Sequence, residues 1–333
     1  MLRATFMGLV WLAVQAHGCA NWRPPPPVKP LYCDGSRFVD DTQFSDAQIV
    51  SLDDVPFGQA VNRHGDEESL VMDMRYPNPA IDPLAKRPVI VLFHPGAFDE
   101  NNPYREDTQS ELTRRFAERG YVAAAVRYRL GFGTYCAEDD QGVAAAAYRA
   151  TQDGRAAVRF LAANASDYGI DPDAMFVGGQ SSGAGVALQV AYLTQALADQ
   201  LFPGLHASLG GLDDSGNDLS AAYTIRGVYS DSGAVVSLGM LDLPLTAVFL
   251  VGMNDTAQPP NEYHNGCTLF PIEYGGLAMA PHTWANGGCT QTFVDPKGGH
   301  LPFADRDEAS WVARAFQATL CGTCASSDQT VTQ

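Results

Sequence analysis

The chain has 333 residues, of which 46 % are hydrophobic, and a formal net charge of −17. This length accommodates one large α/β domain or two small ones. The acidic balance argues against binding to nucleic acid and against electrostatic adhesion to an anionic membrane. Composition alone leaves the substrate and the oligomeric state undetermined.

Residues 1–18 have the pattern of a signal peptide. Arg3 is the only charged side chain before an apolar run at 6–14, and small residues follow it. The run is too short to span a bilayer, so we expect export rather than a transmembrane anchor. Cys19 stands where a bacterial lipoprotein carries its acylated cysteine, and both lipidation and removal of Cys19 stay open. Residues 19–36 are rich in proline and predict an extended spacer. The protein is therefore expected to be secreted, or to be a periplasmic or outer-membrane lipoprotein of a bacterium.

The cysteine count favours disulfide bonds. Export places the chain in an oxidising compartment, and six of the seven cysteines remain if Cys19 is set aside, which is enough for three bridges. Proximity in sequence favours the pairs Cys267–Cys289 and Cys321–Cys324. The last pair also resembles half of a zinc site, but no second half accompanies it. We expect neither a metal nor a cofactor.

Apolar strands alternate with helical patterns along the rest of the chain. This alternation predicts a mostly parallel central sheet with helices on both faces. The expected domain spans residues 37–322, followed by a C-terminal tail at 323–333. The predicted strands are 47–52, 70–74, 89–93, 121–130, 174–177, 225–230, 245–251 and 291–294, and the predicted helices are 107–119, 142–165, one from 184 onward, and 307–320, with a loop at 203–220. In such a sheet, functional groups gather at the carboxyl ends of the strands.

Between the strand 174–177 and the following helix lies the turn Gly179-x-Ser181-x-Gly183. A sharp strand-to-helix turn brings backbones close together, and glycines two residues before and after the centre remove the Cβ atoms that would clash. Ser181 is then the candidate nucleophile. Ser182 follows it and offers a backbone N–H at the start of the helix.

Two later strands end in residues that can activate a serine. Asp255 follows the strand 245–251, and His300 lies on a Gly-rich loop after the strand 291–294. In a triad, His300 takes the proton of Ser181 and Asp255 orients the imidazole. Asp231, after the strand 225–230, is the rival acid. Asp153 is interpreted as a charge on a helix surface.

The loop after the strand 89–93 reads His94-Pro95-Gly96-Ala97-Phe98. The backbone N–H groups of Gly96 and Ala97, together with that of Ser182, are candidates for an oxyanion hole. Pro95 has no N–H to donate.

These segments together resemble the α/β-hydrolase superfamily, in particular its carboxylesterases and hormone-sensitive-lipase-like esterases. The resemblance spans about residues 45–320 and rests on "VIVLFHPGAF", "ERGYVAAAVRYRLG", "QDGRAAVRFLAANASDYGIDPDAMFVGGQSSGAG", "GMNDTAQPP" and "GGHLPF". It implies a nucleophile at Ser181, an acid at Asp255, a base at His300, and an oxyanion hole at Gly96, Ala97 and Ser182. The sequence departs from the family at Pro95, in place of a glycine, and at Val251, in place of the histidine before the acid.

The resemblance implies a serine carboxylic-ester hydrolase whose partner is a small ester. Two alternatives are a serine peptidase of the prolyl-oligopeptidase type, for which the chain lacks room for the usual extra domain, and a non-catalytic binding relative. The Gly/Asp/Ser-rich segment at 209–220 does not resemble an apolar lipase lid, so short or compact esters are expected. Scattered aromatic residues are candidates for the cleft walls: Phe98, Tyr104, Phe132, Tyr135, Tyr263, Phe270 and Phe303. A disulfide-linked wall is expected from the segment between Asp255 and the strand 291–294.

Overall fold

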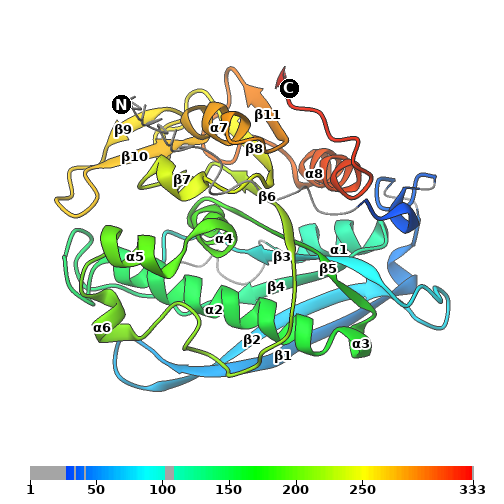
Figure 1. Ribbon diagram of the computed structural model, residues 1–333, viewed down its shortest axis with the longest axis horizontal. Helices are drawn as coiled ribbons and strands as arrows, with labels where there is room; N and C mark the ends of the chain where they lie inside the picture. The colour runs from blue at the N-terminus through cyan, green and yellow to red at the C-terminus, as the bar shows by residue number, and fades with distance from the viewer. Residues whose placement is uncertain (1–27, 34, 41–42, 102–108, 332–333) are drawn as a thin grey trace, which may run out of the picture.

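A computed structural model describes residues 28–33, 35–40, 43–101 and 109–331. A nine-stranded sheet runs through the molecule in the order β1-β2-β4-β3-β5-β6-β8-β11-β12 (Figure 1). The β1/β2 and β2/β4 pairs are antiparallel, and every pair from β4 to β12 is parallel. The strands of this sheet are β1 (Ile49–Val61), β2 (Glu67–Pro77), β3 (Arg87–Phe93), β4 (Val122–Arg127), β5 (Ile170–Gln180), β6 (Ile225–Asp231), β8 (Thr246–Gly252), β11 (Thr290–Asp295) and β12 (Ser327–Thr330). The predicted mostly parallel sheet is confirmed.

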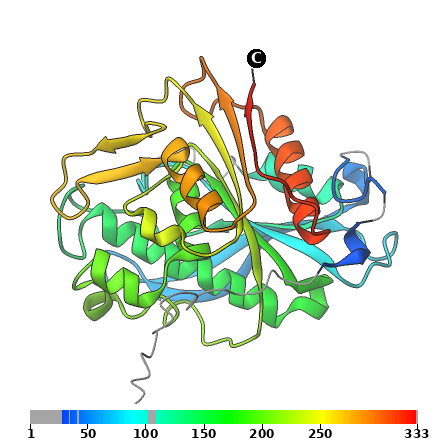
Figure 2. The ribbon, with the colours of Figure 1, turned by 45° about the horizontal axis from the view of Figure 1, so that its top comes forward.

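Helices cover both faces of the sheet (Figures 1 and 2). Alternate residues of β3 point to opposite sides, so Val89, Val91 and Phe93 join one core and Ile90 and Leu92 the other. The first core lies under α2, α4 and α7, and the second lies under α1 and α8. The helices are α1 (Ser110–Glu118), α2 (Val143–Ala163), α3 (Ala165–Tyr168), α4 (Ser182–Tyr192), α5 (Gln195–Leu201), α6 (Leu205–Leu209), α7 (Gly276–Ala285) and α8 (Asp305–Leu320).

The sequence pattern missed the helix α7 and the shorter elements. A second, small sheet has the order β7-β10-β9 and consists of β7 (Ala234–Val235), β9 (Glu262–His264) and β10 (Ile272–Gly275). The short helix α6 lies within the predicted loop 203–220. Elements of two to five residues contain too few positions to show a period, which explains why sequence reasoning passed over them.

Parts of the predicted spacer and tail pack on the domain. Tyr32 is buried, and its hydroxyl donates to Asp171 Oδ2 at 2.7 Å. Lys29 Nζ pairs with the same carboxylate at 2.7 Å. In the predicted tail, β12 extends the central sheet beside β11. The predicted signal peptide at 1–18 and Cys19 lie outside the described residues.

Three disulfides link the described cysteines, but not in the predicted pairs. They join Cys33 to Cys321, Cys136 to Cys267, and Cys289 to Cys324. The local pairs Cys267–Cys289 and Cys321–Cys324 are therefore wrong. Adjacency in the fold decided the pairing, not proximity in sequence. Cys321, at the end of α8, bonds to Cys33 in the N-terminal segment. Cys324 lies just before β12 and bonds to Cys289, which lies just before the neighbouring strand β11.

Asp153 is not a surface charge, as the sequence suggested, but is fully buried in α2. Its carboxylate accepts hydrogen bonds from the backbone N–H of Arg129 at 2.7 Å and from Nε at 2.9 Å. The buried guanidinium of Arg129 also donates to Val61 O at 2.7 Å and Ser215 Oγ at 3.2 Å. This ion pair thus joins the ends of β1 and β4 to α2 and to the loop before β6.

Asp153→Ala should lower the free energy of unfolding by about 3–5 kcal/mol, because it leaves a buried guanidinium without its counter-ion. Asp213→Ala is the matched control, since Asp213 pairs with Arg155 and Arg159 through a half-exposed carboxylate and should cost less than about 1 kcal/mol. Denaturant unfolding monitored by circular dichroism measures both. Equal costs for the two variants would contradict this role of the buried pair.

Candidate active site

The turn between β5 and α4 holds Ser181 in a strained backbone conformation, with φ 53° and ψ −123°. A Cβ at Gly183 would lie 2.1 Å from Phe93 O, and one at Gly179 would lie 2.5 Å from the Gly183 backbone. Only glycine fits at both positions, as the G-x-S-x-G pattern predicted. The backbone N–H of Ser181 donates to Asp231 O at 2.8 Å, which secures the turn against β6.

The structure brings Ser181, His300 and Asp255 together in one hydrogen-bonded chain. His300 Nε2 lies 2.9 Å from Ser181 Oγ, and His300 Nδ1 lies 2.8 Å from Asp255 Oδ2. Asp255 is buried, and its other oxygen accepts the backbone N–H groups of Ala257 at 2.9 Å and Gln258 at 2.8 Å. The carboxylate is thereby fixed in the orientation that holds the imidazole.

The rival acid, Asp231, does not hydrogen-bond to His300 in the described part of the chain and occupies a different environment. It is fully buried, and its Oδ1 accepts the Ser232 hydroxyl at 3.0 Å, while Ser232 Oγ accepts the N–H of Leu301 at 3.0 Å. Burial, together with the negative charges of Asp255 and Asp305, raises the pKa of Asp231 above its ordinary value. A carboxyl that favours its neutral form is a poor partner for an imidazolium, and Asp231 instead supports the loop that carries His300.

The predicted oxyanion loop follows β3 with three successive positive φ angles: 129° at Gly96, 55° at Ala97 and 60° at Phe98. The backbone N–H of Ala97 donates to Ser182 Oγ at 3.0 Å. Tyr128 lies behind the loop and donates its hydroxyl to His94 O at 2.6 Å. The structure thus joins two of the three predicted oxyanion residues through the Ser182 hydroxyl, a contact that the sequence did not suggest.

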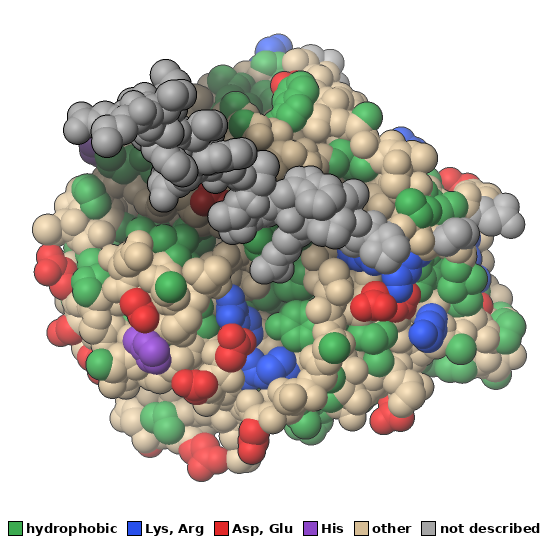
Figure 3. Space-filling model, viewed as in Figure 1, with side chains coloured by type: hydrophobic (Ala, Val, Ile, Leu, Met, Phe, Trp, Pro, Cys, Tyr) green, Lys and Arg blue, Asp and Glu red, His purple; other side chains and the backbone are tan. Residues whose placement is uncertain are grey.

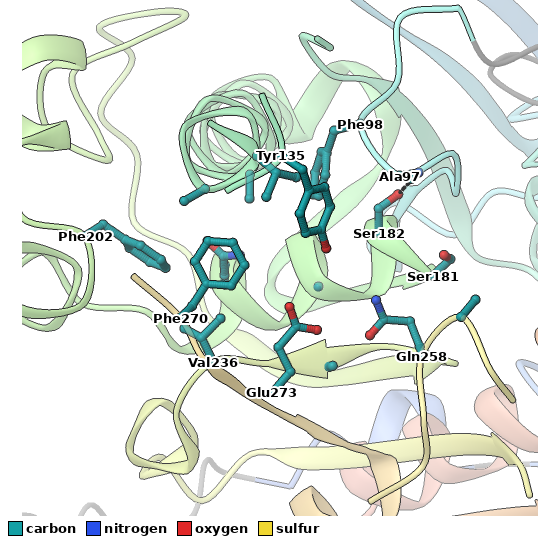
Figure 4. Close-up of a pocket in the computed structure, with 17 residues that line it drawn as sticks. Ala97, Phe98, Tyr135, Ser181, Ser182, Phe202, Val236, Gln258, Phe270 and Glu273 are labelled. Carbon is teal, nitrogen blue, oxygen red and sulfur yellow. Dashed lines mark hydrogen bonds between the residues drawn. The ribbon is translucent and has the colours of Figure 1, made fainter. Parts of the chain in front are cut away.

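A pocket of about 240 Å³ opens beside Ser181 (Figure 4). Figure 3 shows hydrophobic side chains in the hollow of this face, between the regions of α5 and β10. Of the predicted wall residues, Phe98, Tyr135 and Phe270 line the pocket. Phe303 instead packs against Trp311, and Tyr104 lies outside the described residues. Sequence reasoning missed Phe202, Gln189, Gln258 and Glu273, because they come from separate segments and form no motif.

Two walls of the pocket are joined covalently. Cys136 follows Tyr135, and its disulfide partner Cys267 lies three residues before Phe270; the rings of Tyr135 and Phe270 are 6.4 Å apart. The segment after Asp255 thus forms a disulfide-linked wall as expected, although its cysteine partner lies before α2.

Comparison with protein families finds one match, between residues 72–214 and the BD-FAE family model. This segment runs from β2 to the loop before β6 and includes Ser181, but neither Asp255 nor His300. Comparison with curated proteins finds no match.

Several solved structures with the same fold are esterases. Thermogutta terrifontis esterase 2, phosphorylated by paraoxon, is 16% identical with a TM-score of 0.56, and the match covers 85% of this chain and 98% of that one. A truncated carbohydrate esterase from gut microbiota is 15% identical with a TM-score of 0.55, covering 85% and 99%. Esterase B from Lactobacillus rhamnosis is 16% identical with a TM-score of 0.52, covering 84% and 88%. At these identities the matches establish the fold, and this chain has the α/β-hydrolase fold of esterases.

Asp231→Asn should change how stability depends on pH. Because the pKa of Asp231 is raised on folding, the folded protein keeps a proton that the unfolded chain releases above about pH 4, and the free energy of unfolding falls as pH rises. Asparagine is neutral at every pH. From pH 4 to pH 7, the free energy of unfolding of the variant should therefore rise relative to that of the wild type by at least ~1 kcal/mol. Denaturant unfolding across that range tests this, with exposed Asp328→Asn as the control. A difference between variant and wild type that does not vary with pH would refute it.

Proposed function

We propose that the protein is a serine hydrolase of carboxylic esters that works through an acyl-enzyme on Ser181. The observation that carries this proposal is the hydrogen-bonded chain from Ser181 through His300 to the buried Asp255, at 2.9 and 2.8 Å. A serine at a strained strand-to-helix turn beside a pocket is the arrangement that nucleophilic acyl transfer requires. The family match and the bacterial esterases with this fold support the same class of reaction.

In the first half of the reaction, His300 Nε2 takes the proton of Ser181 Oγ as that oxygen attacks the ester carbonyl. Asp255 holds the Nδ1–H tautomer and stabilises the imidazolium. The protonated His300 then gives its proton to the leaving alcohol. In the second half, His300 deprotonates a water molecule that attacks the acyl-enzyme, and Ser181 recovers its proton.

The oxyanion formed in each half requires backbone donors, for which we propose Gly96, Ala97 and Ser182. The Ala97 N–H donates to Ser182 Oγ at 3.0 Å. An oxyanion is a stronger acceptor than a hydroxyl and would draw this N–H toward the substrate. The Ser182 hydroxyl then serves to hold the loop in place before the substrate binds.

The size of the pocket favours compact substrates. Its volume of about 240 Å³ is below the ~300–1,000 Å³ typical of pockets for drug-sized ligands. The aromatic side chains of Phe98, Phe202 and Phe270 close its apolar part. A short acyl or small alcohol group fits such a space, whereas a long acyl chain would extend into solvent.

We also propose that the protein is exported. Three disulfides among the described residues favour an oxidising compartment. No helix within the described part of the chain is long and apolar enough to cross a membrane. Lipidation of Cys19 stays a separate proposal, which labelling with a clickable fatty acid would test.

Ser181→Ala should abolish ester hydrolysis and labelling by a fluorophosphonate probe, and Asp255→Asn should lower kcat by about 10⁴-fold through loss of the correct tautomer. Ser182→Ala is the matched control: it keeps its backbone N–H and should keep both labelling and a measurable rate. Rates on p-nitrophenyl acetate and probe labelling measure all three. Labelling that survives Ser181→Ala but is lost in Ser182→Ala would move the nucleophile, and no labelling of the wild type would make this a binding protein.

The acyl preference should be narrow. Across p-nitrophenyl esters of two to sixteen carbons, kcat/KM should peak at acetyl or butyryl and fall steeply beyond about eight carbons. The pocket cannot bury a longer acyl chain, so the further CH₂ groups gain none of the ~0.8 kcal/mol that burial of each would supply. An optimum at twelve carbons or more, with activation at an oil–water interface, would make the protein a lipase.

A further inference from the structure

The pocket beside Ser181 contains one charged side chain among the described residues that line it, and that side chain is acidic. Glu273 lies on β10, is 8 % exposed, and points its carboxylate into the pocket opposite Tyr135 (Figure 4). No Lys, Arg or His belongs to this described lining. A buried carboxylate without an opposite charge is costly, which makes its presence informative.

The hydrogen bonds of Glu273 come from neutral groups. The Tyr263 hydroxyl donates to Oε2, and Asn265 Nδ2 donates to Oε1 at 2.7 Å. Burial and the nearby Glu273 charge raise the pKa of Tyr263, which keeps its O–H a donor. These two donors hold the carboxylate in place but do not neutralise it, so the charge is left for a ligand to compensate.

Four aromatic residues line the same pocket as this carboxylate. Tyr135 and Phe270 pack with ring centroids 6.4 Å apart, and Phe98 and Phe202 also line the pocket. Burial raises the pKa of Tyr135, and the charge of Glu273 adds to this effect, so the field of the carboxylate reaches the opposite wall. Ring faces attract cations, most strongly where water is excluded.

We propose that this pocket selects esters whose acyl or alcohol part carries a positive charge, such as an ammonium group, and rejects anionic esters. The inference rests on the proposed esterase function and adds the chemical class of its substrate. A hydroxyl on the substrate would add a third neutral donor to a carboxylate that already has two. A cation supplies the missing charge and also contacts the aromatic rings.

The test compares two acetate esters of nearly the same shape, acetylcholine and its neutral carbon analogue 3,3-dimethylbutyl acetate. For the wild type, kcat/KM should be about tenfold or more higher for the cationic ester. Glu273→Gln should bring this ratio close to one. A ratio of two substrates measured on one preparation does not depend on the fraction of active enzyme, so partial misfolding of the variant does not obscure the result.

Glu262→Gln is the matched control, because Glu262 lies on the adjacent strand β9 but is exposed and lies outside the pocket. It removes the same charge and should keep the wild-type ratio. A wild-type ratio of one or less, or a ratio unchanged in Glu273→Gln, overturns the cation proposal alone, provided that p-nitrophenyl acetate is hydrolysed and Ser181 is labelled. If neither ester is hydrolysed and Ser181 is not labelled, the esterase function and the cation proposal fail together.

Discussion

The close approach of three strands at the turn that carries Ser181 is the constraint on which the rest of the site depends. Ser181 sits at φ 53° with its N–H bound to Asp231 O on β6, and Gly183 lies against Phe93 O at the end of β3. Such backbone strain costs on the order of 1–3 kcal/mol and persists only where the surroundings enforce it. The parallel strands β3, β5 and β6 enforce this conformation. The same strand ends carry the proposed oxyanion loop and the residues that support the loop of His300.

Beneath this turn, burial separates the carboxyl groups into two kinds. Asp231 and Glu308 are fully buried, and burial raises the pKa of both. Gln180, the residue before Ser181, donates to Glu308 Oε2 at 3.0 Å. Asp255 instead accepts two backbone N–H groups as well as the imidazole. Neighbouring carboxyls in different environments can take different parts in one mechanism, and in the proposed mechanism it is Asp255 that faces the developing positive charge on the imidazole.

The pocket is assembled from segments that are remote in sequence. Tyr135 lies on the loop before α2, Phe270 and Glu273 lie near β10, and the Cys136–Cys267 disulfide joins the two regions across 131 residues. Asp255 also contacts this wall, because the N–H of Gln258 that it accepts belongs to a residue of the pocket lining. The acid of the proposed triad therefore lies on the same chain segment, between β8 and α7, as Phe270 and Glu273 of the proposed specificity wall.

The sequence by itself determined the mostly parallel sheet, the helices α1, α2, α4 and α8, and the glycine-flanked turn at Ser181, because strand and helix periods and the steric need for glycine are local. It also indicated Asp255 and His300, since both follow apolar strands in the expected order. Only the tertiary structure decided which acid reaches the histidine, which cysteines pair, that Asp153 is buried against Arg129, and that Glu273 faces the pocket. Each of these depends on which strand ends and loops become neighbours, and no local pattern of residues records that adjacency.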